Sequence, residues 1–152
     1  MKEVSCSVTA PLIREFRKQG LPAADLAVGS GYSLAYLENK HERIEWRAFL
    51  RIIANARGHW NDEHFKEYGA SFLKSPIIRS FTIVARLLFT VREFYLWIAN
   101  SAPVFTCIRG GPIRELGPNR MEISALLADG YEPCREFYLI TLGGFAELPR
   151  LF

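Results

Sequence analysis

The chain has 152 residues, of which 49% are hydrophobic and 13% aromatic, and its net charge at pH 7 is +3. This length suits one domain with a single core, and the composition is too apolar for a disordered chain. The 19 basic residues are scattered along the sequence, whereas nucleic-acid-binding domains gather positive charge on one face, so the charge pattern disfavours a nucleic-acid partner.

Cysteine usage and hydropathy predict the compartment. The three cysteines, at positions 6, 107 and 134, form no Cys-x-x-Cys pair, so we expect free thiols and a cytoplasmic protein. The first ten residues lack the apolar core of a signal peptide. The most apolar stretch, from Ile77 to Asn100, contains four charged residues, so we expect no membrane span.

The first forty residues predict three short helices. Pro11 to Gln19 begins with a proline in its first turn and ends at Gly20, a pattern typical of helix boundaries. Pro22 to Val28 predicts a second helix. Leu34 to Glu38 predicts a third, with Ser33 as its N-cap.

Longer amphipathic helices follow. One is predicted over Glu45 to Arg57 and the next begins at Asn61 or Asp62, because apolar residues recur at helical spacing. Further helices are predicted after Ser75-Pro76 and at the capping-box pair Thr90 and Glu93. The inward residues are Trp46, Phe49, Leu50, Ile53, Phe65, Tyr68, Gly69, Phe72, Ile77, Phe81, Val84, Leu88, Val91, Phe94, Tyr95 and Ile98.

The last third changes to a strand pattern. We predict strands over Val104 to Arg109, Ile113 to Leu116 and Arg120 to Leu127, with tight turns at Gly110-Gly111 and at Gly117-Pro118-Asn119. Met121, Ile123, Ala125 and Leu127 alternate with polar residues, as in a strand with one buried face.

A final helix is predicted from Pro133, with Gly143-Gly144 loosening its end. The fold class is therefore α+β, with a helical first two-thirds packed on a small antiparallel β-meander and a closing C-terminal helix. Residues 1–152 form one domain. The apolar tail from Leu148 to Phe152 favours a domain cut from a longer signalling protein.

No catalytic or metal-binding motif is found in the sequence. His41, His59 and His64 have no metal-ligand spacing, and neither a nucleophile elbow nor a phosphate-binding loop occurs. Cys134 is the remaining candidate, because a helix N-terminus would lower the pKa of its thiol. We expect no enzyme, and a small enzyme using Cys134 is an alternative.

The segment Leu26 to Leu37 imitates a helix-turn-helix, which makes a DNA-binding regulator a second alternative. Its second helix offers Ser33, Ala35, Tyr36 and Glu38, and only Asn39 is a good reader of base edges. A small packing motif explains the segment better.

The aromatic residues point to a binding function. Most of them must form the core, but so many rings can also leave a cavity between helices and sheet. We predict that Trp97 and Tyr138 line a ligand pocket, that Arg109 or Arg114 meets an anionic group, and that Cys134 lies at the rim. The partner would be a small-molecule ligand or the output module of the same chain, and a homodimer is expected.

Two stretches resemble known families. Gly20 to Phe72, with Leu21-Pro22, Glu38-Asn39, Arg43-Ile44 and Gly58 to Gly69, resembles the arabinose-binding-like N-terminal domain of AraC-type regulators. Pro103 to Phe152 resembles the haem-NO-binding and 4-vinyl-reductase type of ligand-binding domain, in which a cysteine opens a helix that ends near a glycine; Cys134 and Gly143 occupy such positions.

The resemblance implies an N-terminal sensory domain of a bacterial signalling protein, ahead of a histidine kinase, a nucleotide cyclase or a DNA-binding module. It also implies haem as an alternative ligand in a gas sensor, although the Tyr-x-Ser-x-Arg signature of those sensors is missing here. The expected function is thus sensory and non-catalytic, with a ligand or partner bound between helices and sheet.

Overall fold

The computed structural model of the chain describes residues 2–73, 90, 92–93, 105–117 and 120–151. The helix predicted at 76–88 and most of the one predicted at 91–98, including Trp97, lie outside the described residues. The capping-box prediction at Thr90 is confirmed, since its backbone N–H donates to the Glu93 carboxylate at 2.7 Å and the Glu93 N–H donates to the Thr90 hydroxyl at 3.2 Å.

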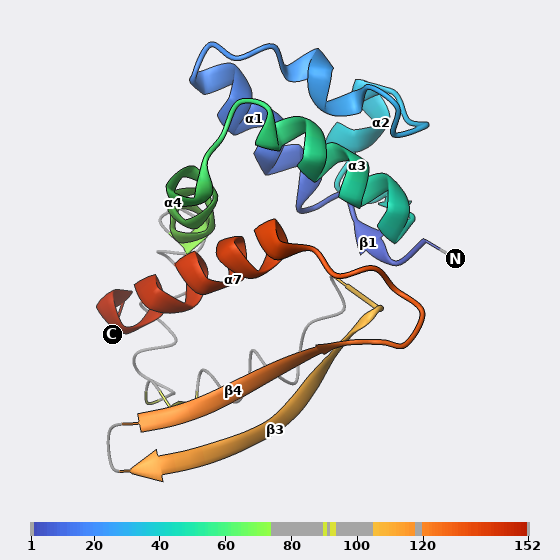
Figure 1. Cartoon of the computed structure of the whole chain (residues 1–152). Coiled ribbons are helices and arrows are strands. Elements are labelled where there is room, and N and C mark those ends of the chain that lie inside the picture. The colour runs from blue at the N-terminus through green and yellow to red at the C-terminus, as the bar shows by residue number, and fades with distance from the viewer. Residues whose placement is uncertain (1, 74–89, 91, 94–104, 118–119, 152) are drawn as a thin grey trace.

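The described elements form a mixed α+β fold (Figure 1). In chain order they are β1 (Val4–Ser5), α1 (Thr9–Lys18), a 3-10 helix (Ala23–Ala27), α2 (Leu34–Glu38), β2 (Arg43–Ile44), α3 (Trp46–Arg57), α4 (Asp62–Leu73), β3 (Ile108–Gly117), β4 (Arg120–Leu127), α7 (Arg135–Glu147) and a 3-10 helix (Leu148–Leu151).

Local capping explains where the N-terminal helices begin. The Ser33 hydroxyl accepts a hydrogen bond from the Tyr36 N–H at 3.2 Å, and the side-chain Oδ1 of Asn61 accepts one from the His64 N–H at 3.1 Å. Both predicted caps are therefore confirmed. The predicted second helix is a single 3-10 turn, since the chain leaves it through Gly29 and Gly31, which have positive φ angles.

The core lies among α1, α3, α4 and α7. Phe16, Ile52 and Phe65 have no exposed surface, and Trp46, Phe49 and Ile53 of the predicted stripe on α3 are buried. Two short strands, β1 and β2, pair antiparallel at the edge of this core, with Val4 opposite Ile44. Among the described residues, no helix is long and apolar enough to cross a membrane.

Helix α7 crosses α4 at backbone contact, and glycines make this contact possible. A Cβ atom at Gly69 would lie 1.9 Å from the Ile140 carbonyl oxygen. A Cβ at Gly143 would lie equally close, at 1.9 Å, to the Lys66 carbonyl oxygen. The prediction that Gly143-Gly144 loosens the end of this helix was wrong, because both glycines lie inside α7, which continues to Glu147.

The sheet in the last third is a two-stranded hairpin. The predicted turn at Gly110-Gly111 was wrong: β3 runs unbroken from Ile108 to Gly117, with a register shift between Gly110 and Ile113. Gly111 is required there for close packing, because a Cβ would lie 2.7 Å from the Ser124 Cβ. The glycine pair thus supports a bulge, and the predicted three-stranded meander has two strands.

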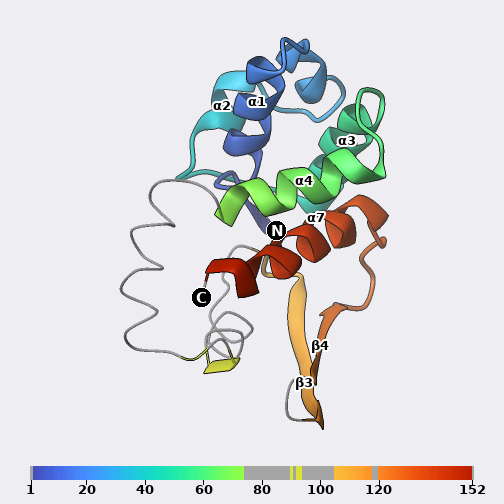
Figure 2. The same ribbon diagram turned by 90° about the vertical axis from the view of Figure 1, so that its left-hand side faces the viewer.

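The hairpin lies on the far side of α7 from α1, α2 and α3 (Figures 1 and 2). Phe105 connects it to the core through an isolated bridge to Val4. The predicted alternation of β4 is confirmed in part: Met121, Ile123 and Leu127 are partly covered and Glu122 is exposed, but Ser124 on the polar face is also partly covered and no residue of the strand is buried.

Candidate ligand cavity

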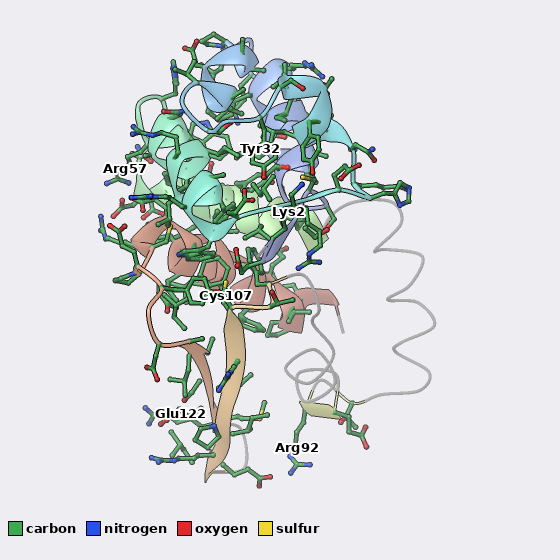
Figure 3. The ribbon with its side chains drawn as sticks, turned by 90° about the vertical axis from the view of Figure 1, so that its right-hand side faces the viewer. Lys2, Tyr32, Arg57, Arg92, Cys107 and Glu122 are labelled. Carbon is green, nitrogen blue, oxygen red and sulfur yellow. The ribbon has the colours of Figure 1, made fainter. Side chains whose placement is uncertain are left out.

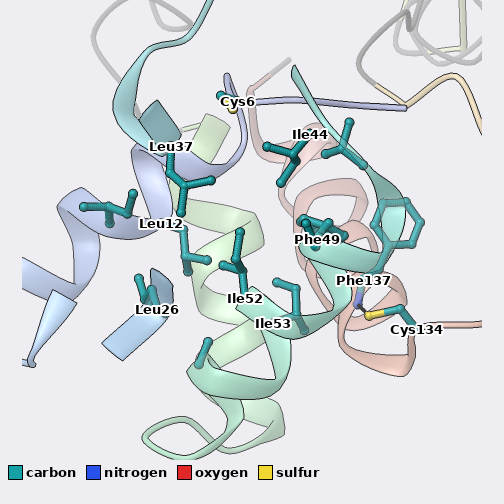
Figure 4. Packing of buried hydrophobic residues seen from close by; sticks show 14 of the residues in the cluster. Cys6, Leu12, Leu26, Leu37, Ile44, Phe49, Ile52, Ile53, Cys134 and Phe137 are labelled. Atoms are coloured by element: carbon teal, nitrogen blue, oxygen red, sulfur yellow. Dashed lines mark hydrogen bonds between the residues drawn. The ribbon is translucent and has the colours of Figure 1, made fainter. Parts of the chain in front are cut away.

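A cavity of about 250 Å³ lies where four helices meet. Its described walls come from the start of α1 and from α3, α4 and α7, together with Phe105 at the entrance to the hairpin. The lining residues are Val8, Leu12, Phe49, Ile53, Tyr68, Gly69, Phe72, Phe105, Phe137, Ile140, Thr141, Gly144, Phe145 and Leu148. Figure 4 shows Leu12, Phe49, Ile53 and Phe137 within this part of the core.

Aromatic rings form two of the walls. On one side, Phe105 packs between Phe49 and Phe137, with ring centroids 5.6 and 4.9 Å apart. On the other side, Tyr68 packs edge-on against Phe72 at 4.9 Å. These geometries are those that aromatic quadrupoles favour. Some of the many aromatic residues in the sequence therefore line this cavity.

The glycine crossing forms part of the same wall. Gly69 of α4 and Gly144 of α7 both line the cavity, next to Ile140. A Cβ added at Gly144 would lie 3.5 Å from the Gly69 carbonyl oxygen, which is ordinary van der Waals contact. The absence of side chains at these two positions therefore leaves room beside the crossing.

The polar groups in the lining are already satisfied by the backbone. The Tyr68 hydroxyl donates to the Val8 carbonyl at 3.2 Å, and the Thr141 hydroxyl donates to the Phe137 carbonyl at 2.9 Å. Burial raises the pKa of Tyr68 well above its usual value, so its phenol stays neutral. No charged side chain occurs in the described lining, so the cavity favours an uncharged, apolar occupant.

The structure places the predicted ligand residues away from this cavity. Arg109 and Arg114 are exposed on β3, and Tyr138 is 40% exposed on α7. Cys134 lies one turn before Tyr138, at the beginning of the same helix. None of these four lines the cavity, and Trp97 is outside the described residues. Sequence reasoning missed Tyr68, Phe72, Ile140 and Gly144 as lining residues, although the aromatic or glycine character of three of them, Tyr68, Phe72 and Gly144, was visible.

Cys134 occupies the predicted helix N-terminus, and its Sγ accepts the Phe137 N–H at 3.4 Å. The predicted lowering of its pKa was wrong. Burial, as the largest effect, raises the pKa of this thiol to about 11, and the nearby Glu136 carboxylate adds to the rise. With 5% of its surface exposed, Cys134 serves as a buried cap for α7, because the cost of desolvating a thiolate exceeds the benefit of the helix dipole.

The donor set for haem does not fit this cavity. Its described lining contains no histidine, cysteine or methionine, and the hydroxyl of Tyr68, the one other possible axial ligand in it, donates to the Val8 carbonyl. His59 instead faces the Phe16 ring and the Asp25 carboxylate, and His64 pairs with Asn61. Nowhere in the described residues do three or more His, Cys, Asp or Glu side chains gather as a metal site.

The segment that imitates a helix-turn-helix folds into a 3-10 turn and the five-residue helix α2. Tyr36, a residue of its second helix, points back to the chain: its hydroxyl donates to the Arg43 carbonyl at 3.0 Å and accepts from Lys2 at 2.5 Å. These contacts tie α2 to β1 and β2.

Comparison with known protein families, with curated proteins and with solved structures gives no significant match for this chain. The geometry of the cavity therefore carries the functional argument.

Proposed function

We propose that this chain is a non-catalytic sensory domain that binds a small, uncharged, apolar molecule in the ring-lined cavity. The observation that carries the proposal is an apolar, partly open pocket of about 250 Å³ among packed helices. An engineered apolar cavity of about 150 Å³ binds benzene, and drug-sized sites begin near about 300 Å³. The volume therefore suits a ligand of one or two rings or a short acyl chain.

The position of the cavity suits a regulatory role. Helix α7 supplies more of the lining than any other described helix, including Phe137, Ile140 and Phe145. A ligand that binds one packing of α7 against α4 better than another shifts the balance between them. The proposed output is therefore a change in the position of α7, transmitted to an output module of a signalling protein.

Binding is tested with naphthalene and with 2-naphthoate, which share a ring system but differ in charge. Ligand-dependent stabilisation, measured as a rise in melting temperature, reports binding to the folded state. We expect naphthalene to stabilise the protein and 2-naphthoate to have little effect, because the lining offers no partner for a carboxylate. Equal stabilisation by both compounds would contradict the proposal.

A pair of adjacent substitutions locates the site. Thr141 lines the cavity, whereas the next residue, Leu142, does not line it and is 55% exposed. Thr141→Phe should fill the cavity and weaken naphthalene binding at least about tenfold, while Leu142→Phe should leave it unchanged. The same new side chain is introduced in both variants, so equal affinities in the two would place the ligand elsewhere and sink the assignment.

A further inference from the structure

The exposed face of the β3–β4 hairpin carries three arginines. Arg109 pairs with Leu126 and Arg114 with Glu122 in the antiparallel register, and Arg120 lies two residues before Glu122. Residues directly opposite one another, and residues two apart on one strand, project from the same side of a sheet. Arg109, Arg114, Arg120, Glu122 and Leu126 therefore share one face, here named the arginine face, and all five are exposed.

Among the described residues, the charge of the arginine face is not compensated. No described side chain forms a hydrogen bond or ion pair with the guanidinium groups of Arg109, Arg114 or Arg120. Some arginines elsewhere have acidic partners, as Arg17 does in Glu38 and Arg135 in Asp62. Three guanidinium groups and one carboxylate leave the face with a surplus of positive charge, which attracts acidic groups.

The backbone of the hairpin is also available for pairing. The described sheet contains β3 and β4 alone, so each strand has one outer edge with no described β-partner. Such an edge is a template for an added strand from another chain. The hairpin lies apart from α1, α2 and α3 (Figure 3, with Glu122 labelled), where an extended segment can approach it.

The two faces of the hairpin differ, and this difference specifies the partner. Opposite the arginine face, Ile113, Met121 and Ile123 form a partly covered apolar face. A strand added at the edge continues both faces, so acidic residues would lie beside the arginines and apolar residues beside the isoleucines. The exposed Leu126 and the acidic Glu122 within the arginine face favour a protein partner over a nucleic acid, because phosphates gain nothing from leucine and are repelled by glutamate.

We propose that the hairpin is a docking surface for an extended protein segment in which acidic and apolar residues alternate, added as a strand to an edge that has no β-partner among the described residues. This interaction is independent of the apolar cavity. The arginines that the sequence pointed to as anion contacts thus act on a partner chain and have no part in holding a small ligand.

The test uses the full chain and a labelled peptide of alternating Glu and Val, with binding followed by fluorescence anisotropy. We expect binding that weakens as ionic strength rises. The variant Arg109→Glu/Arg114→Glu should bind about tenfold more weakly, because each reversal replaces an attraction by a repulsion. Arg14 and Arg47 are exposed and lie on α1 and α3, so Arg14→Glu/Arg47→Glu is a control with the same net charge.

Three results would overturn the proposal. They are the absence of peptide binding at low ionic strength, an equal loss in the hairpin variant and the control, and tighter binding of a duplex oligonucleotide than of the peptide. Circular dichroism and thermal melting of both double variants establish that they remain folded. A peptide of alternating Lys and Val reports non-specific strand addition, and binding as tight as that of the Glu-Val peptide would also contradict the charge argument.

Discussion

Gly143 of α7 lies directly against the backbone of Lys66 in α4, so closely that a Cβ at position 143 would come within 1.9 Å of the Lys66 carbonyl oxygen. Gly69 makes the reciprocal approach to the backbone of α7. Helices normally pack 8–10 Å apart because side chains separate them; two glycines remove this separation. The crossing holds the C-terminal helix on the core and borders the proposed ligand cavity.

Gly143→Ala is expected to lower the free energy of unfolding by about 2 kcal/mol, whereas Gly144→Ala is expected to be neutral or stabilising. Alanine favours a helix over glycine by about 1 kcal/mol at either position. At Gly143 the added methyl meets rigid backbone, and such overpacking costs about 1–3 kcal/mol or more. At Gly144 the nearest atom lies at 3.5 Å. Urea unfolding of both variants makes the comparison, and equal stabilities would contradict the backbone-contact geometry.

Glu3 joins the N-terminal segment and the loop between β4 and α7 to the beginning of α3. Its carboxylate accepts the Trp46 N–H at 2.9 Å and the Tyr131 hydroxyl at 3.2 Å, and the residue is 5% exposed. Glu3→Gln turns one of these acceptors into a donor, so we expect a loss of about 1–3 kcal/mol in unfolding free energy. The same change at exposed Glu122 should have little effect.

A double-mutant cycle isolates the Glu3–Tyr131 contact. Tyr131→Phe removes the hydroxyl alone, and the loss in the Glu3→Gln/Tyr131→Phe variant should be smaller than the sum of the two single losses. Denaturant unfolding supplies the three differences. Strict additivity would show that this hydrogen bond contributes nothing to stability.

The cysteines are expected to be unreactive in the folded protein. Cys6, Cys107 and Cys134 are buried, and burial raises the pKa of each thiol, to about 11 for Cys134. Since the thiolate is the reactive form, Ellman's reagent at about pH 8 should label the native protein slowly and the unfolded protein rapidly. Rapid native labelling, mapped to Cys134 by mass spectrometry, would restore the redox alternative.

Asp62 is expected to make stability depend on pH in the acid range. Its hydrogen bond from Arg57, with the charge of Arg135, lowers the pKa of this carboxyl below its usual 3.8. The unfolded chain therefore takes up the proton first as pH falls. The stabilisation is present above the unfolded pKa and is lost as pH falls through the folded pKa.

Asp62→Asn should accordingly melt at a lower temperature than the native chain at neutral pH, and this difference should vanish in acid. Melting temperatures across the acid range measure it. The exposed Asp129, changed to Asn, is the matched control. A difference between Asp62→Asn and the native chain that persists unchanged in acid would refute the ion-pair explanation.

Local sequence patterns predicted much of the helical part. The caps at Ser33, Asn61 and Thr90 depend on a side chain and a backbone group three residues away, so the neighbouring sequence contains all the information needed. The stripe on α3 likewise follows from a period of 3.6 residues. Strand β3 ends at Gly117 and β4 begins at Arg120, on either side of the predicted turn, of which residues 118–119 lie outside the described residues.

The predictions were wrong where a local pattern had two structural interpretations, namely at two glycine pairs and at one buried cysteine. Gly110-Gly111 has the composition of a hairpin turn, but the approach of Ser124 across the sheet makes it a bulge. The pair at Gly143-Gly144 looks like a helix end, but the backbone of α4 lies against it. For Cys134, the position at the beginning of a helix suggested a lowered thiol pKa. Burial in the core raises that pKa instead.

By itself, the sequence determined that the chain folds as an α+β domain, where most of its described helices begin, and that its aromatic residues lie together. Only the tertiary structure decided which rings surround a cavity, that Arg109 and Arg114 face outward, and that α4 and α7 meet at glycine. The reason is physical: capping and periodicity act within a few residues, whereas desolvation, close backbone approach and empty space depend on segments that are distant in the chain.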